Sequence, residues 1–176
     1  MDIPGLGAVE QDEGTGWWLS GERPIAMLGG ARCCIVVEGY DEDDSKQDFH
    51  RAIANFLAAD EAVLKAASSA VFAYYKDMLA YTSSPGDEAY VPIASPDDVW
   101  SHVQFGYEPI VSRYHHGDKR VYISLECNCD WEPEHGLQIV FRDGNRVCKV
   151  GPYDGHLTNG DTSGDGSADE VIYRHL

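Results

Sequence analysis

The feature that most constrains the fold is the stretch 119–144, KRVYISLECNCDWEPEHGLQIVFRDG, in which apolar and polar side chains alternate. Alternation with a period of two is typical of a β-strand with one buried face. The residues expected to face the core are Val121, Ile123, Leu125, Cys127, Cys129 and Trp131. The residues expected on the opposite, exposed or ligand-facing side are Tyr122, Ser124, Glu126, Asn128 and Asp130. The sequence therefore predicts a central strand with one packed face and one working face.

The chain is expected to turn back directly after this strand. Pro133 has no N–H to donate to a sheet, and Gly136 loosens the backbone before the next alternating run at 137–142. Asp143-Gly144 is a tight-hairpin signal that leads into a further strand at 146–150. The bend at 130–135, which we call the polar corner, concentrates carboxylates and an imidazole between two strands.

Helical periodicity occupies the N-terminal half. Ser45 and Asp48 form a capping box before a first helix, and Asp60 can cap a second, longer helix whose apolar stripe runs from Val63 to Tyr81. Ser95-Pro96 begins a short helix that ends near His102. Further strands are expected near 17–19, 24–28, 31–38, 105–114 and 170–173.

These elements predict an α+β fold. We expect an antiparallel β-meander of about five to seven strands, with two long helices from the N-terminal half and one short helix packed on it. The length suits a single domain over 1–176. Within it we expect a loose N-terminal arm at 1–16, a strand–helix–helix part at 17–82, and a part at 95–176 with the short helix, the meander and a polar C-terminal loop.

Charge narrows the classes of partner. Thirteen basic and 30 acidic residues give a formal net charge of −17, which repels phosphates and so excludes nucleic acid and anionic membranes as partners. The same charge favours a basic protein partner or cations. No apolar run reaches the roughly 18 residues of a membrane span, and the N-terminus lacks the pattern of a signal peptide. The odd number of cysteines, five, is typical of reduced thiols, so we expect a cytoplasmic location.

The candidate binding residues are polar and lie at the corner and in the later loop. They are Glu126, Asn128, Asp130, Glu132, Glu134, His135, Asp154 and His156. Three interpretations of them stay open: acid–base chemistry, a divalent cation held by hard oxygens, and a structural or partner-binding bend. No nucleophile, phosphate-binding glycine loop or oxyanion element accompanies them, so no catalytic residue is assigned.

Two other metal patterns are weaker. The Cys127-x-Cys129 spacing places both thiols on one face of a strand, roughly 6–7 Å apart, where zinc ligands do not converge, so we expect core packing. Asp161, Ser163, Asp165 and Asp169 match positions of a calcium loop. The last position of that loop is Ile172, however, where a bidentate glutamate is required. No cofactor is therefore expected, and a divalent cation is the one alternative.

Two motifs carry a resemblance. The run Glu126–Leu137, E-C-x-C-D-W-E-x-E-H-G-L, followed by the D-G-H-L-T-N loop at 154–159, resembles an uncharacterised bacterial family of unknown function. The resemblance extends back through 34–79. It implies a small domain and assigns no catalytic residue.

The sequence favours a non-enzymatic, acidic binding domain. Some acidic proteins of this size are immunity proteins that neutralise a secreted toxin, and by that analogy of type we expect a basic partner. The alternative is a divalent-cation-binding domain or metal-dependent hydrolase that uses the polar corner. The oligomeric state is not predicted.

Overall fold

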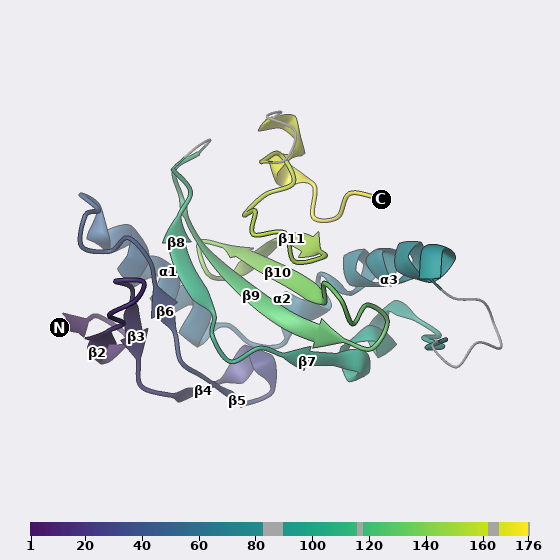
Figure 1. Ribbon diagram of the computed structural model, residues 1–176, viewed down its shortest axis with the longest axis horizontal. Coiled ribbons are helices and arrows are strands. Elements are labelled where there is room, and N and C mark those ends of the chain that lie inside the picture. Colours follow the sequence, from purple (N-terminus) through teal and green to yellow (C-terminus); the bar gives the residue numbers. More distant parts are fainter. Residues whose placement is uncertain (83–89, 116–117, 162–165, 176) are drawn as a thin grey trace.

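The computed structural model describes residues 1–82, 90–115, 118–161 and 166–175. These residues form a large twisted sheet with helices on one face (Figure 1). The strands are β1 (Asp2–Ile3), β2 (Gly7–Gln11), β3 (Trp18–Ser20), β4 (Arg23–Ile25), β5 (Ala31–Cys33), β6 (Val36–Val37), β7 (Val103–Phe105), β8 (Ile110–Arg113), β9 (Val121–Cys129), β10 (Leu137–Arg142) and β11 (Arg146–Gly151). The helices are α1 (Lys46–Ala58), α2 (Ala62–Lys65) and α3 (Ser68–Thr82), with 3₁₀ helices η1 (Ala26–Leu28), η2 (Pro96–His102) and η3 (Gly166–Glu170).

The sheet confirms the α+β class and extends it. In the described residues nine strands join in the order β1-β2-β3-β6-β8-β9-β10-β11, with β7 paired to β9 beside β8, while β4 and β5 form a separate hairpin. The predicted meander, β9-β10-β11, forms one end of this order and pairs antiparallel. The sheet is larger than expected, and it is not wholly antiparallel, because β6 pairs with β8 in parallel.

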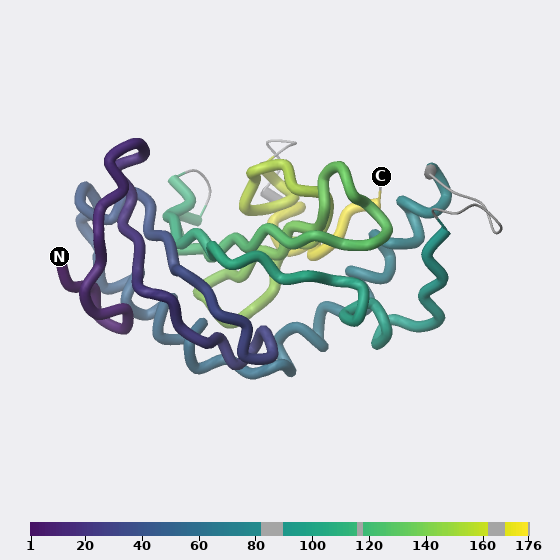
Figure 2. The backbone as a smooth tube through the Cα atoms, turned by 60° about the horizontal axis from the view of Figure 1, so that its bottom comes forward, coloured from purple at the N-terminus to yellow at the C-terminus, as the bar shows by residue number. Residues whose placement is uncertain are grey.

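The helices lie against one face of the sheet and bury the predicted core. Figure 2 shows α1 and α2 along one side of the sheet and the loop at 152–161 on the other. The C-terminal segment, residues 152–161 and 166–175, then runs past β11 to α3, where the Tyr173 hydroxyl donates to Asp77 at 2.8 Å. Phe49 and Phe56 of α1 and Tyr74 of α3 are fully buried, and Phe56 meets Phe141 edge-on at 5.5 Å between ring centroids. All six residues predicted for the inner face of β9 and the start of its bend belong to this core.

The N-terminal arm was predicted to be loose, and that prediction is wrong. Residues 2–11 form β1 and β2, and β2 pairs with β3, so this part extends the main sheet. Ile3, Leu6 and Val9 are buried. The Arg23 guanidinium holds the link between the strands by donating hydrogen bonds to the Gly5 and Leu6 carbonyls. Three apolar side chains in a glycine-rich sequence are enough to dock the segment once a sheet edge is available.

Several predicted elements are divided. The run 31–38 is β5 and β6 in different sheets, the run 105–114 is β7 and β8, and the second helix breaks between α2 and α3. The predicted strand at 170–173 is absent from the described elements, although the Ile172 carbonyl accepts a hydrogen bond from the Val150 N–H at 2.8 Å. Short runs do not reveal where the chain changes partner, because each piece alone has the same alternation.

The capping of α1 differs from the predicted box. Ser45 occupies the cap position, but its side chain makes no capping bond. Instead the Asp43 carboxylate accepts the Ser45 N–H at 2.7 Å and also pairs with Arg113 of β8. Arg113 donates a further hydrogen bond to Asp48 at 3.0 Å. The acidic residues before α1 therefore attach the start of the helix to the sheet.

Gly144 gives the first test. At φ +81° it adopts the left-handed conformation of the β10–β11 turn, and an added Cβ would lie 2.0 Å from the Ala52 carbonyl of α1. We expect Gly144→Ala to lower the free energy of unfolding by about 3–4 kcal/mol, from backbone strain and overpacking together. Gly155, at φ +76° with no atom within 4 Å of such a Cβ, is the matched control. Gly155→Ala should cost about 1–2 kcal/mol in chemical denaturation. Equal costs would contradict the contact between turn and helix.

Candidate functional site

The sheet face opposite the helices carries a groove of two adjoining hollows of about 360 Å³ each. Both hollows are lined by Ile110, Ser124 and Tyr153, and we call them together the sheet groove. The first lies over β8–β10, where Ser112 and Gln138 join its lining. The second lies where β7 gives way to β8. Its further lining includes Gln104, Tyr107, Glu108, Glu126 and Asn128.

The second hollow exists because β9 changes neighbour along its length. β7 pairs with the end of β9 at 127–129, and β8 pairs with its beginning at 121–124. The link 106–109 bends away between them. Gly106 is required there, since an added Cβ would lie 2.0 Å from the Glu126 carbonyl. The Tyr107 and Pro109 carbonyls accept hydrogen bonds from the N–H groups of Cys34 and Val36, at 2.8 and 3.0 Å, which fixes the bend.

Three carboxylates border the groove without partners. Glu38 lines the first hollow, and Glu108 and Glu126 line the second. In the described part of the chain none of the three has a side-chain hydrogen bond or a salt bridge within 4 Å. Burial raises the pKa of the Tyr153 phenol, and the negative charges of Glu126, Asp154 and Glu38 raise it further. The groove therefore carries three carboxylates without an internal partner around an accessible aromatic ring.

One wall of the groove is held by a buried lysine. Lys149 of β11 is 2% exposed, and its Nζ donates to the Gln138 amide oxygen at 2.9 Å, to the His156 carbonyl at 3.0 Å and to the Asp154 carboxylate. Gln138 in turn donates to the Ser124 hydroxyl at 2.9 Å. Burial lowers the pKa of Lys149, and the pairing with Asp154 acts against that shift. This network fixes residues 153–157 over the sheet.

The expected convergence of Asp154 and His156 on the polar corner is not found. Asp154 pairs with Lys149, and His156 contributes its backbone to that network: its carbonyl accepts from Lys149 and its N–H donates to Asp154 at 2.9 Å. The backbone does return to the corner, because the Tyr153 N–H donates to the His135 carbonyl at 3.1 Å.

The predicted working face of β9 is half covered. Glu126, Asn128 and Asp130 are exposed as expected, but Tyr122 is fully buried and Ser124 is 9% exposed. Tyr122 packs in a second small apolar cluster with members from β10, β11 and the C-terminal segment. The prediction of an exposed or ligand-facing side was therefore wrong at Tyr122, which the distant C-terminal segment covers, whereas Ser124 lines both hollows of the sheet groove.

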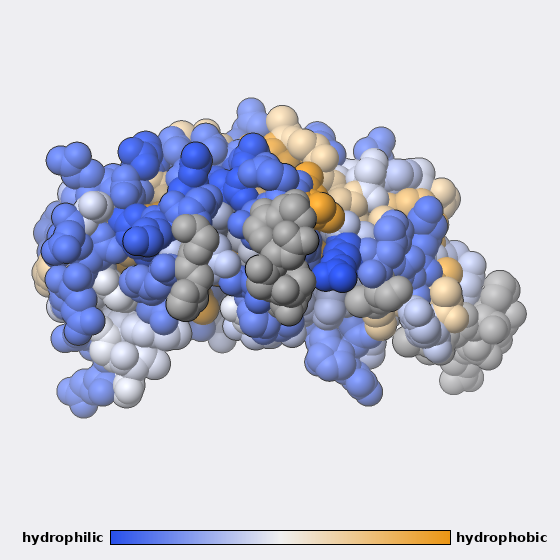
Figure 3. Space-filling view, turned by 90° about the horizontal axis from the view of Figure 1, so that it is seen from above, coloured by the Kyte–Doolittle hydropathy of each residue, from blue (hydrophilic) through white to orange (hydrophobic). Residues whose placement is uncertain are grey.

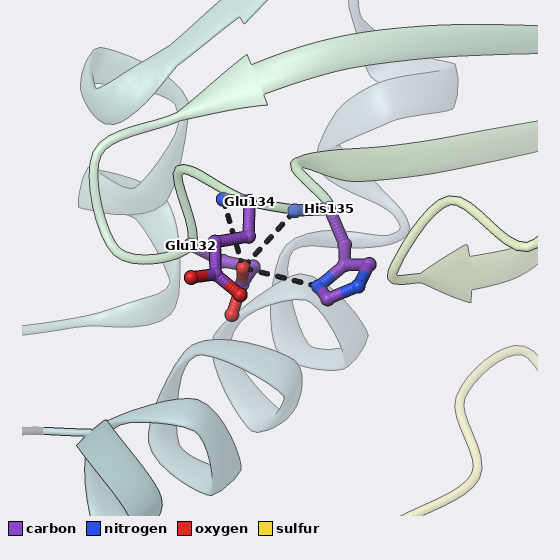
Figure 4. A group of neighbouring side chains, drawn as sticks. All are labelled: Glu132, Glu134 and His135. Carbon is purple, nitrogen blue, oxygen red and sulfur yellow. Dashed lines mark hydrogen bonds and ion pairs between the residues drawn. The ribbon is translucent and has the colours of Figure 1, made fainter.

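The polar corner divides into a buried cap and an exposed pair. Glu132 is only 5% exposed, and one oxygen of its carboxylate accepts the N–H groups of Glu134 and His135, both at 3.0 Å (Figure 4). The prediction of an outward-facing Glu132 was wrong, because the tight bend leaves N–H groups that need an internal acceptor. Asp130 does face outward. Hydrogen bonds from His102 and Gln104 lower the pKa of its carboxyl.

The corner also contains a group of atoms suited to a cation. Ligand atoms of Glu132, Glu134 and His135 lie within 4.8 Å of one another, the one such group in the described ranges. His135 Nδ1 lies 3.4 Å from the same Glu132 oxygen (Figure 4). That oxygen already accepts the two capping hydrogen bonds. The bend alone therefore accounts for the close approach of these three side chains.

The cysteines pack as predicted. Cys127 and Cys129 are buried in the main core, and all five cysteines are free thiols. Burial raises the pKa of each of these two thiols to about 12, as expected of thiols packed in an apolar core.

The calcium-like pattern is only partly within the described residues. Asp161 accepts the Leu157 N–H at 3.0 Å, and Asp169 accepts the Thr158 hydroxyl at 2.8 Å, so both acids support the C-terminal segment. Ser163 and Asp165 lie outside the described residues.

Sequence reasoning missed much of the groove. The residues not selected come from separate strands and links that approach only in the folded sheet: Glu38, Tyr107, Glu108, Ser112 and Gln138. The one available signal was the Gly106 and Pro109 pair inside the run taken as a single strand, since both residues are typical of an interruption.

A family model matches residues 5–157, and its description is Domain of unknown function (DUF6985). The chain belongs to this family. No curated protein and no solved structure gives a significant match. Among the described helices, none is both long enough and apolar enough to cross a bilayer.

The cap at Glu132 gives a second test. Glu132→Ala removes the acceptor of two partly buried N–H groups and should lower the free energy of unfolding by about 2–3 kcal/mol. Glu134→Ala, two residues away and exposed, is the matched control and should change it by less than about 0.5 kcal/mol. Thermal and urea denaturation of both variants measure the difference. A harmless Glu132→Ala would show that the bend does not need this cap.

Proposed function

We propose that this domain binds a basic protein segment in the sheet groove. The observation that carries the proposal is the set of unpaired carboxylates, Glu38, Glu108 and Glu126, on the border of a hollow that also exposes tyrosine rings. A net charge of −17 supports it, because a strongly negative protein attracts basic partners over distances near the Debye length. Seen from above the C-terminal segment, the surface is dominated by hydrophilic residues, with a smaller hydrophobic area (Figure 3).

Binding fits the groove better than nucleophilic catalysis. A catalytic serine needs a neighbouring base, usually a histidine or a carboxylate in hydrogen-bond contact. In the described residues Ser124 is bonded to the Gln138 amide, and no hydrogen bond joins Ser112 to a base. The groove therefore offers recognition groups and no activated nucleophile.

The finer proposal is an immunity-type role. A cytoplasmic protein that neutralises a basic toxin needs an acidic surface with a shaped recess, and the sheet groove has that chemistry. This step rests on charge and on the analogy with acidic proteins of similar size.

The test is the salt dependence of a defined complex. The tagged chain is used to capture partners from its native host, and each captured protein is identified, purified and titrated by calorimetry. We expect a basic partner whose dissociation constant rises at least about tenfold from low to high salt, because the attraction is electrostatic. Recovery of no basic partner at either salt concentration would overturn the proposal.

Variants with matched charge locate the contact. The triple variant Glu38→Gln, Glu108→Gln and Glu126→Gln should weaken the complex at least about tenfold. The control removes the same charge elsewhere, through Glu10→Gln, Glu13→Gln and Glu42→Gln at exposed positions. Equal weakening by the two triple variants would assign the effect to net charge alone and remove the groove from the proposal.

A divalent-cation site at the polar corner is the second candidate, favoured by the 4.8 Å grouping of Glu132, Glu134 and His135. If Ca²⁺, Mg²⁺, Mn²⁺ or Zn²⁺ binds there, the ion should raise the melting temperature by mass action. Glu134→Gln and His135→Gln should abolish the rise, whereas Glu10→Gln should preserve it. No change of melting temperature with any of the four ions would eliminate this candidate.

A further inference from the structure

The second hollow of the sheet groove gathers exposed aromatic surface. The large hydrophobic side chains exposed in the described residues are Met1, Tyr81, Tyr107, Tyr153 and Val171. Two of them, Tyr107 at 68% and Tyr153 at 38% exposure, line this one hollow from separate segments of the chain. Accessible rings gathered at one recess are typical of a binding site, because exposed apolar area is otherwise unfavourable.

The charge of the second hollow is entirely negative. Glu108 and Glu126 line it, and no lysine, arginine or histidine is among its described lining residues. The first hollow differs, since Arg113 and His115 contribute to its wall. Both glutamates are exposed and unpaired in the described structure, whereas Asp130 and Asp154 are each already paired. A cation would therefore be bound in the second hollow without displacing an internal partner.

The groove continues along β8 to the hydroxyl of Ser112. Ser112 is 8% exposed and lines the first hollow, two residues from Ile110, which lines both. Its hydroxyl has no hydrogen-bond partner in the part of the chain that the structure describes. A hydroxyl at the wall of a recess can donate or accept a hydrogen bond with a bound segment. The backbone of an extended segment lying along β8 would supply one about 7 Å from the second hollow.

We infer that the second hollow receives an arginine side chain of the basic partner, held between the rings of Tyr107 and Tyr153 and the carboxylates of Glu108 and Glu126. This inference rests on the proposed function and names its ligand. A guanidinium group is planar, stacks on aromatic rings, and donates paired hydrogen bonds to carboxylates. A divalent cation does not fit, because tyrosine rings are not ligands for hard ions, and the glutamates of this hollow do not belong to the converging group at the corner.

Lysine is the less suitable cation for this recess. Its ammonium group is compact and strongly hydrated, and it offers no flat surface to two aromatic rings. Arginine and lysine carry the same charge, so a difference in their affinities would report the contact with the aromatic rings.

The probes are three acetylated and amidated peptides of the form Gly-Gly-X-Gly-Gly, in which X is arginine, lysine or citrulline. Citrulline keeps the shape of arginine and lacks its charge. Titration of the isotope-labelled full chain by NMR should show shifts at Tyr107, Glu126 and Tyr153 with the arginine peptide, with a dissociation constant on the order of millimolar. The lysine peptide should bind several-fold more weakly, and the citrulline peptide should leave these resonances in place.

Two variants test the assigned contacts. Tyr153→Leu removes the ring while keeping apolar volume, and Glu126→Gln removes one charge. Each should weaken binding of the arginine peptide at least about fivefold. Tyr81→Leu, at a tyrosine that is 72% exposed outside the groove, and Glu10→Gln are the matched controls and should bind as the unmodified chain does. Unchanged melting temperatures confirm that each variant is folded.

Each outcome decides one of the two proposals. Equal shifts with arginine and citrulline, equal affinity for arginine and lysine, or unaffected binding by Tyr153→Leu and Glu126→Gln would overturn the arginine site. A salt-dependent basic partner that still binds these two variants with full affinity would leave the proposed function in place and remove only this inference. Absence of any basic partner would remove the proposed function, whatever the peptides show.

Discussion

The structure depends on the burial of one face of β9. This strand is the longest in the sheet, and its inner side chains meet α1 and the rest of the main core while its backbone pairs with β10 on one side and with β7 and β8 on the other. Burial of a continuous apolar row fixes the register, because a shift by one residue would turn every inner side chain outward. The register then places Ser124, Glu126 and Asn128 on the opposite face. Burial of the inner face of β9 therefore also determines which of its residues line the candidate groove.

The outer face is shaped by two buried cations. Lys149 holds the loop at 153–157, and Arg142, 4% exposed, donates to the Tyr122 hydroxyl, the Asp169 carbonyl and the Glu170 carboxylate. Burying a charge is unfavourable unless partners satisfy it, and each of these cations has three. The two side chains therefore attach the C-terminal segment to the sheet at defined points. That attachment covers Tyr122 and leaves the groove open on the side of β8.

Acidic residues in this protein serve different purposes according to their neighbours. Asp43 and Asp48 join α1 to β8 through Arg113, and Glu132 caps a bend from within. In the described residues, the carboxylates of Glu108 and Glu126 form no side-chain hydrogen bond or salt bridge. A dense run of acids in sequence is therefore a poor guide to function here, because the carboxylates most available to a ligand come from separate segments of the chain, the β7–β8 link and β9.

The sequence by itself determined the central hairpin, the inward thiols of Cys127 and Cys129, the Asp143-Gly144 turn and the α+β class. Each of these follows from interactions between neighbours in the chain or from a period of two or 3.6 residues. Only the tertiary structure decided that residues 2–11 join the sheet, that the C-terminal segment covers Tyr122 and that Tyr107 and Tyr153 line one hollow. Those outcomes depend on which distant segment covers a given face, and local periodicity carries no information about that choice.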